Sequence, residues 1–183
     1  MRKARIAFRF GHYGDCFHGS QVQPDVPTVQ GTFMHIFKKK LKWTQEKMPV
    51  AFSSRTDSGV HVRLNGGFID LEQERWDAMG EAGFVKAVGH QIPESISLID
   101  ARQVPDDWSP RRALYRTYRY RMECMEGWVE PELEAFADLC SLFKGEHDWS
   151  NFCRREPGRT TTRVVEDCNP CVNDGRIVGF EIV

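Results

Sequence analysis

Two hydrophobic periodicities alternate along the chain, and their order constrains the fold more than any other feature of the sequence. Residues 5–10 and 115–124 alternate apolar with basic or polar side chains, which is typical of a strand with one buried face. Residues 28–41 and 131–143 repeat apolar residues at helical spacing, with Thr28 as N-cap and Pro131 in the first turn. Because this order occurs twice, we expect an α+β fold of two similar α/β subdomains with antiparallel or mixed sheets.

Shorter segments extend this pattern. Further extended runs are expected at residues 50–52, 68–71, 96–104, 163–167 and 176–183. The last two are joined through Asn173-Asp174-Gly175, a strong hairpin signal. Residues 74–91 have a helical composition, but three glycines each cost up to about 1 kcal/mol in a helix and so predict a broken one.

A domain boundary is predicted where a strand ends and a differently charged stretch begins. This change occurs at Val104-Pro105-Asp106-Asp107. We therefore expect an N-terminal α/β domain over residues 1–105 and a C-terminal α/β domain over residues 106–183.

Composition excludes several classes of protein. With 40% hydrophobic and 28% charged residues in 183, the chain has the composition of a globular protein rather than a disordered one. The net charge of -1 means that a polyanion partner must be met by a local patch. No apolar run approaches the roughly 18 residues that span a bilayer, so we expect a cytoplasmic protein without a membrane partner, whose six cysteines remain free thiols.

Basic residues are concentrated in two stretches. One holds five arginines within eleven residues that contain no acid: Arg111, Arg112, Arg116, Arg119 and Arg121. The other holds Arg154, Arg155, Arg159 and Arg163, with only Glu156 to offset them. Either could coat a solvated surface. Aromatic residues interleave with both stretches, and because arginine binds phosphate while aromatic faces stack on unpaired bases, the combination favours RNA.

The loop of residues 53–59 is the candidate catalytic segment. It places Arg55, Asp57 and three hydroxyl side chains between two expected strands. Asp57 before Ser58-Gly59 could simply form an Asx-turn. Alternatively, Arg55 keeps the Asp57 carboxylate ionised, so that it can act as a nucleophile or as a base.

Metal and redox chemistry have little support in the sequence. The six histidines show no His-x-x-x-His or His-Glu-x-x-His spacing. Cys168-x-x-Cys171 lacks a second such pair and a βαβ context, so a metal or redox role is improbable there. A metal-dependent nuclease centred on Asp57 would need more clustered carboxylates than this loop supplies.

Ordered motifs across the whole chain resemble one family. Residues 54–61, Ser-Arg-Thr-Asp-Ser-Gly-Val-His, are similar to the Gly-Arg-Thr-Asp-x-Gly-Val-His signature of the TruA-type tRNA pseudouridine synthases, whose Asp is catalytic. The family's Phe-x-Gly-Trp-Gln-x-Gln, Thr-Val-Gln, Arg-x-Tyr-x-Tyr and Gly-x-His-Asp-Phe-x-x-Phe blocks resemble residues 17–23, 28–30, 116–120 and 145–152. Ser20 and Ser54 depart from the family's usual Trp and Gly. The family continues beyond the position of Val183, so we expect the second domain to be incomplete.

The resemblance implies a pseudouridine synthase fold with an active-site cleft between two subdomains, and isomerisation of uridine to pseudouridine in the tRNA anticodon stem-loop, at positions 38 to 40. It implies no metal or other cofactor, tRNA as partner, and a homodimer. Asp57 and Arg55 would be catalytic, with Arg55 paired to Asp57, and Tyr118 would stack on the flipped uracil. Other substrate-binding residues would be His61, Arg111, Arg116, Arg119 and Arg154. The alternative is a catalytically incomplete RNA-binding fragment or paralogue of the same family.

Overall fold

The computed structural model describes residues 2–153, 157–158 and 160–183, which form two compact units. The first unit is Met1–Ala113 and the second is Leu114–Val183. Residues after Val104 stay with the first unit because the Trp108 carbonyl accepts a hydrogen bond of 3.0 Å from Arg5 Nη1 and the Trp108 ring contacts Phe68 edge-on. None of the helices among the described residues has the length and hydrophobicity of a membrane-spanning segment.

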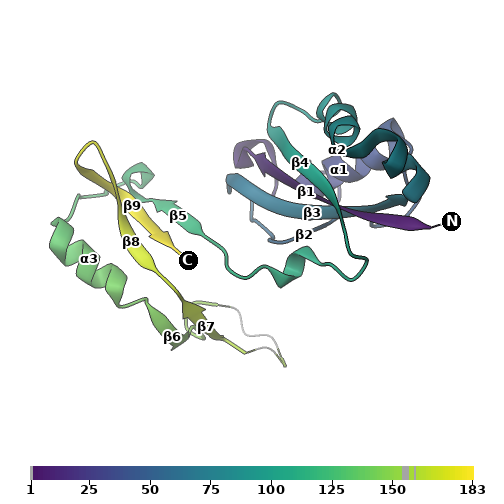
Figure 1. The fold of residues 1–183 in the computed structure, drawn as a ribbon. Helices are drawn as coiled ribbons and strands as arrows, with labels where there is room; N and C mark the ends of the chain where they lie inside the picture. Colours follow the sequence, from purple (N-terminus) through teal and green to yellow (C-terminus); the bar gives the residue numbers. More distant parts are fainter. Residues whose placement is uncertain (1, 154–156, 159) are drawn as a thin grey trace. The chain divides into compact units, whose positions relative to one another are not determined.

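The first unit is built on a four-stranded antiparallel sheet of order β2-β3-β1-β4 (Figure 1). Its strands are β1 (Lys3–His12), β2 (Ala51–Phe52), β3 (Val62–Glu72) and β4 (Ile96–Val104). The central strand β1 pairs along its length with β3 and β4. Gly67 of β3 lies opposite Phe8, and a Cβ there would come within 3.0 Å of the Phe8 ring. The absence of a side chain at Gly67 therefore leaves room for the Phe8 ring against β3.

Two helical segments cover the apolar face of this sheet. Helix α1 (Val29–His35) begins at Thr28, whose hydroxyl accepts a hydrogen bond from the Gly31 amide, and continues as a π-helical turn over Ile36–Lys40. Helix α2 (Gln73–Gly89) follows β3 directly. Phe8 of the sheet contacts Phe33 and Phe37 from the first segment and Phe84 from α2, so both pack on one face.

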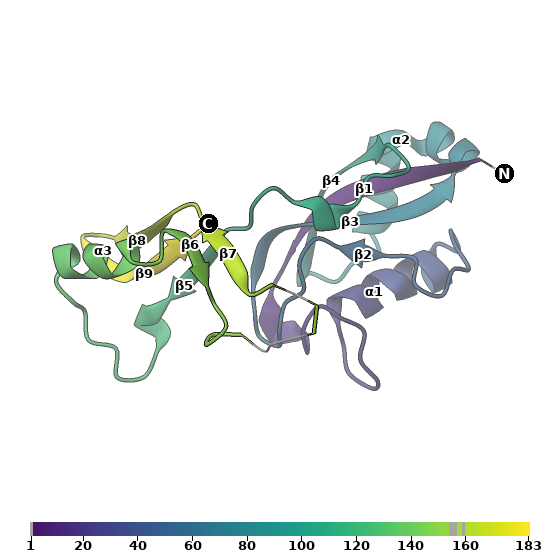
Figure 2. The same ribbon diagram turned by 90° about the horizontal axis from the view of Figure 1, so that it is seen from below.

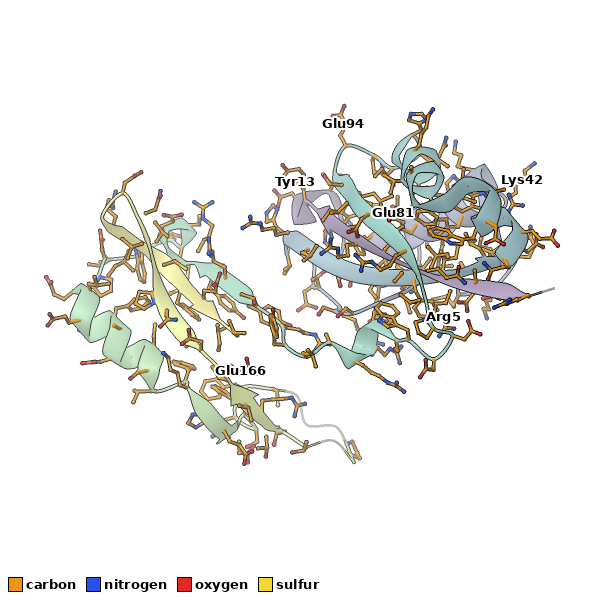
Figure 3. All side chains as sticks on the ribbon, in the orientation of Figure 1. Arg5, Tyr13, Lys42, Glu81, Glu94 and Glu166 are labelled. Atoms are coloured by element: carbon orange, nitrogen blue, oxygen red, sulfur yellow. The ribbon has the colours of Figure 1, made fainter. Side chains whose placement is uncertain are left out.

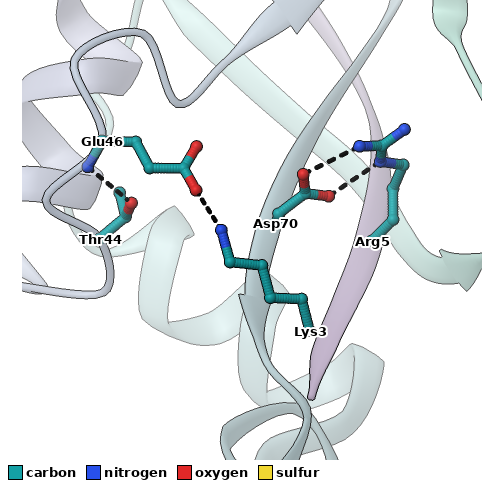
Figure 4. Close-up of polar contacts among 5 residues, drawn as sticks. All are labelled: Lys3, Arg5, Thr44, Glu46 and Asp70. Atoms are coloured by element: carbon teal, nitrogen blue, oxygen red, sulfur yellow. Dashed lines mark hydrogen bonds and ion pairs between the residues drawn. The ribbon is translucent and has the colours of Figure 1, made fainter. Parts of the chain in front are cut away.

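The opposite face of β1 carries paired charges. Arg5 binds Asp70 on β3 through two hydrogen bonds of 2.8 and 2.9 Å (Figure 4). The Arg5 guanidinium also lies 4.3 Å from the centre of the Phe68 ring. Arg9 binds Asp100 on β4 in the same way. These cross-strand pairs follow from the period of two, because Arg5 and Arg9 point away from the core that Ile6 and Phe8 fill.

The second unit contains a three-stranded sheet, a two-stranded sheet and one α-helix. Strands β5 (Tyr118–Arg121), β9 (Arg176–Ile182) and β8 (Cys168–Asn173) pair in that order, and β6 (Gly145–Asp148) pairs with β7 (Thr162–Val165). Helix α3 (Leu133–Ser141) runs beside β8, as Figure 2 shows. The buried hydrophobic cluster of the second unit is small: Cys140, Val165 and Cys168, with four partly buried neighbours. Burial raises the pKa of the Cys168 thiol to about 11, which fits a core residue.

The structure confirms the mixed α/β class with antiparallel sheets and most predicted elements. Two predictions in the second unit were wrong in detail. Strand β5 covers only Tyr118–Arg121, because β9 offers it partners only from Gly179 to Ile182. The turn after Asn173 joins β9 to β8 rather than to β7, and β8 was missed because Pro170 interrupts its pattern; β8 is an edge strand, which tolerates proline.

Candidate active site

Residues 53–61 form a loop that leads from β2 into β3, beside the segment that follows β1. The two segments touch at residues 14 and 59–60, since a Cβ on Gly14 would lie 2.4 Å from the backbone carbons of Gly59 and Val60. The Gly14 amide donates a hydrogen bond of 3.3 Å to His61 Nδ1. The loop is therefore packed along the end of the sheet rather than projecting from it.

Two buried side chains anchor the loop on either side of Arg55. Asn65 on β3 donates to the Ser54 carbonyl at 3.0 Å and accepts from the Ser54 amide at 3.3 Å. Ser20 accepts from the Thr56 amide at 2.8 Å, and its own amide donates to the Thr56 carbonyl at 2.9 Å. Because Asn65 and Ser20 are 5% and 1% exposed, these hydrogen bonds are shielded from water.

Asp57 and Arg55 are exposed at the surface of this loop. The Asp57 carbonyl accepts from the Val60 amide at 3.3 Å across a turn that places Gly59 at φ 79°. In the part of the chain that the structure describes, the expected Arg55–Asp57 ion pair is not formed, and no side-chain hydrogen bond engages the Asp57 carboxylate as an Asx-turn would. The carboxylate is thus held in place by its backbone and is open to a bound molecule.

One histidine ends the loop, and a second lies beside it at the end of β1. His61 is exposed, and its Nε2 lies 3.6 Å from the Asp15 carboxylate. His12, at the end of β1, is 6% exposed and contacts Phe10 and Phe17. Burial lowers the pKa of His12 below its ordinary value; nearby His61 lowers it further, against a backbone hydrogen bond with Val60 that raises it. His12 Nδ1 is buried without a hydrogen-bond partner among the described residues.

The remaining candidate residues lie on other elements. Arg111 lies in a 3-10 turn (Pro110–Arg112) that ends the first unit. Arg116 and Tyr118 are exposed in the second unit, and Tyr118 pairs with Ile182 in the β5–β9 ladder. Arg154 lies outside the described residues. The structure therefore gathers Arg55, Asp57 and His61 on one loop, and places the predicted uracil-stacking Tyr118 in a different unit.

Arg119 lies on β5 and is already engaged. Its guanidinium donates to the Glu181 carboxylate on β9 at 2.9 and 3.2 Å, and this pairing raises its pKa. The neighbouring Tyr120 stacks on Phe180, with ring centres 4.9 Å apart. Arg119 lines an open hollow of about 500 Å³ on this sheet together with Arg121, Asn169, Cys171 and Asn173.

Sequence reasoning missed Ser20 and Asn65 as site residues. Asn65 had a detectable signal: in β3 it occupies a position whose alternate neighbours Gly67, Ile69 and Leu71 are buried, so a buried amide is expected to have a partner. Ser20 had no such signal, because its partner Thr56 is 36 residues away and only the fold brings them together.

Comparison with known proteins finds relatives along most of this chain. The chain is 32% identical to tRNA pseudouridine synthase A of Thermococcus kodakarensis over 177 residues, which is 95% of this chain and 62% of the relative. By sequence, the chain is similar over most of its length to the TruA-type tRNA pseudouridine synthase family. It is also 33% identical to tRNA pseudouridine synthase A of Thermococcus gammatolerans and of Methanopyrus kandleri, over 88% and 90% of this chain.

The family match is partial in length. The chain spans 57% to 62% of the three TruA-type relatives named above. No family model matches the chain.

Proposed function

We propose that this chain carries the catalytic aspartate of a tRNA pseudouridine synthase and isomerises uridine to pseudouridine in the tRNA anticodon stem-loop, at positions 38 to 40. The observation that carries the proposal is the Asp57 loop. Its sequence matches the family signature, its backbone is fixed by buried hydrogen bonds, and its carboxylate is exposed and unpaired among the described residues.

In this reaction the uracil exchanges its bond to the ribose from one ring atom to another. The C1′–N1 bond breaks, the uracil rotates and a C1′–C5 bond forms, while the proton at C5 leaves to solvent and N1 takes up a proton. Asp57 supplies the carboxylate that acts on the nucleotide as nucleophile or base. Arg55, two residues away and exposed, fills the space left by the extruded base, while Tyr118 stacks on the flipped uracil.

The two units are proposed to share this work. The first unit provides the catalytic loop, and the second provides Tyr118 and arginines that bind the RNA backbone. Arginine contacts to phosphates supply affinity without reading bases. A homodimer binding one tRNA across both copies completes the proposal.

The release of tritium from tRNA labelled at C5 of uridine tests the activity. We expect Asp57→Asn to lower the rate by about a thousandfold or more, because an amide neither attacks carbon nor accepts the proton. Glu81→Gln on α2 makes the same carboxylate-to-amide change at an exposed position (Figure 3) and should keep the rate of the unaltered protein. Equal rates for Asp57→Asn and Glu81→Gln would reject the catalytic assignment.

The Arg119–Glu181 pair gives a separate test of RNA binding. Glu181→Gln leaves Arg119 without its acid, so tRNA should bind more tightly at low salt. Arg119→Ala should weaken binding and reduce the slope of log affinity against log salt by roughly one. If both variants keep the original affinity and slope, Arg119 does not contact the RNA.

A further inference from the structure

We propose that Ser20 is a positioning residue for Asp57, an inference that rests on the proposed function. Ser20 belongs to the segment between β1 and α1, far from the catalytic loop in sequence. Its hydroxyl lies 2.8 Å from the amide nitrogen of Thr56, the residue directly before Asp57. The Thr56 peptide sets where the Asp57 Cα lies, so an anchor on Thr56 acts on Asp57 through one residue.

Ser20 holds Thr56 from both sides of the residue. The hydroxyl accepts from the Thr56 amide, and the Ser20 amide donates to the Thr56 carbonyl at 2.9 Å. Ser20 Oγ also lies 3.4 Å from the same carbonyl. The backbones approach so closely that a Cβ on Gly19, which has φ +89°, would lie 2.8 Å from the Thr56 carbonyl oxygen. This contact fixes both the position and the direction of the Thr56 peptide.

The anchor is itself hydrogen-bonded to α1. The carbonyls of Gly19 and Ser20 accept hydrogen bonds from the Val29 and Gln30 amides, at 3.3 and 3.0 Å, in the first turn of α1. The hydroxyl of Thr28 caps the same helix by accepting from Gly31. Ser20 therefore connects the first turn of α1 to the loop through hydrogen bonds. Such support from a helix helps a reactive side chain on a loop to keep its geometry.

The residue that follows Asp57 is held as well. Ser58 Oγ lies 3.4 Å from the Phe17 carbonyl, in the same segment that carries Ser20. Asn65 fixes Ser54 from β3. With residues 54, 56 and 58 anchored, the Asp57 carboxylate keeps mainly its side-chain rotation, so little conformational freedom is lost when substrate binds.

A hydroxyl at position 20 is a chemical requirement of this arrangement. The indole of a tryptophan, which the TruA-type family usually carries there, donates hydrogen bonds but does not accept them. It could not accept from the Thr56 amide as Ser20 does.

Two measurements on Ser20→Ala test the proposal. Amide hydrogen exchange at Thr56 should become about tenfold faster or more, because the amide loses its buried acceptor. The turnover number for tritium release should fall about tenfold with little change in KM, because Asp57 is misplaced while the RNA contacts are retained. Ser20→Thr retains the hydroxyl and should restore both values toward those of the unaltered protein.

Val88→Ala on α2 is the matched control for general destabilisation, since Val88 is fully buried in the core. It should not change the exchange of Thr56 relative to other loop amides. If Ser20→Ala leaves Thr56 exchange unchanged, or speeds it without lowering the turnover number, the proposal is overturned. If the unaltered chain shows no turnover, the proposed function fails, while the exchange measurement still decides whether Ser20 holds the loop.

Discussion

His12 is a buried ionisable residue whose charge state couples the region of the loop to pH. Its pKa in the folded chain lies below the ordinary value of 6.5, chiefly because of burial. Below pH 6.5 the unfolded chain therefore binds a proton at this histidine more readily than the folded chain does. The free energy of unfolding consequently falls as the pH decreases below 6.5, and His12 no longer lowers it above that pH.

His12→Gln should flatten this dependence. We expect the urea midpoint of the unaltered chain to drop between pH 6.5 and about pH 5, and that of His12→Gln to drop less over the same interval. Urea denaturation followed by far-ultraviolet circular dichroism at both pH values measures the difference. Parallel profiles would show that His12 does not titrate with folding.

Single residues also show how far the sequence can predict a site. The Asp57 loop and the Thr28 N-cap could be identified from their own neighbours, because turn formers and helix caps are local features. The Arg55–Asp57 pairing was predicted from the spacing of two residues, but both residues are exposed and no ion pair joins them among the described residues. The Ser20 and Asn65 anchors depend on tertiary contacts that spacing does not encode.

Helix α2 was predicted to be broken, and the structure places the break at Gly80. This residue has φ 58° and ψ -168°, a conformation that side chains other than hydrogen disfavour, while Gly89 at the end of the helix has ordinary angles. A Cβ at either position would meet open space, so the backbone angles alone separate the two glycines.

Alanine substitutions at these glycines should have opposite effects on stability. Gly80→Ala should lower the free energy of unfolding by about 1 to 3 kcal/mol through backbone strain. Gly89→Ala should raise it by up to about 1 kcal/mol, because alanine restricts the unfolded chain. Thermal or urea unfolding of the two variants provides the comparison, and a Gly80→Ala variant as stable as Gly89→Ala would mean that the kink is not required.

Strands and helices were predicted best where apolar residues recur at a regular spacing in the sequence. Strands β1 and β4 were located well because one face of each meets the aromatic core. The start of β3 was missed because its sequence pattern and its burial disagree: apolar Leu64 is exposed there, while polar Asn65 is buried. The sequence of β8 contains proline and asparagine, which interrupt the alternation of apolar and polar residues that identifies a strand. Its pairing with β9 stabilises it instead.

At the scale of the molecule, the two units differ in the size of their buried cores. The first unit buries a continuous cluster with six phenylalanines, whereas the cluster of the second is Cys140, Val165 and Cys168. Since apolar burial is the main source of stability, the second unit should open more readily than the first.

Native-state hydrogen exchange measures this difference directly. Central amides of β1 should be protected about a hundredfold more than central amides of β9 under the same conditions. Mass spectrometry of peptides from the two strands, or amide-resolved NMR, gives both values in one sample. Equal protection would indicate that the two units open together as one cooperative structure.

We propose that the Asp57 loop converts uridine to pseudouridine in the anticodon stem-loop of tRNA, and the position of each product nucleotide tests this most directly. Carbodiimide modification followed by reverse transcription locates each pseudouridine in a tRNA transcript incubated with the protein. We predict stops at one or more of positions 38 to 40 with the unaltered chain and none with Asp57→Asn. An unmodified transcript, or the same stops with Asp57→Asn, would contradict the account.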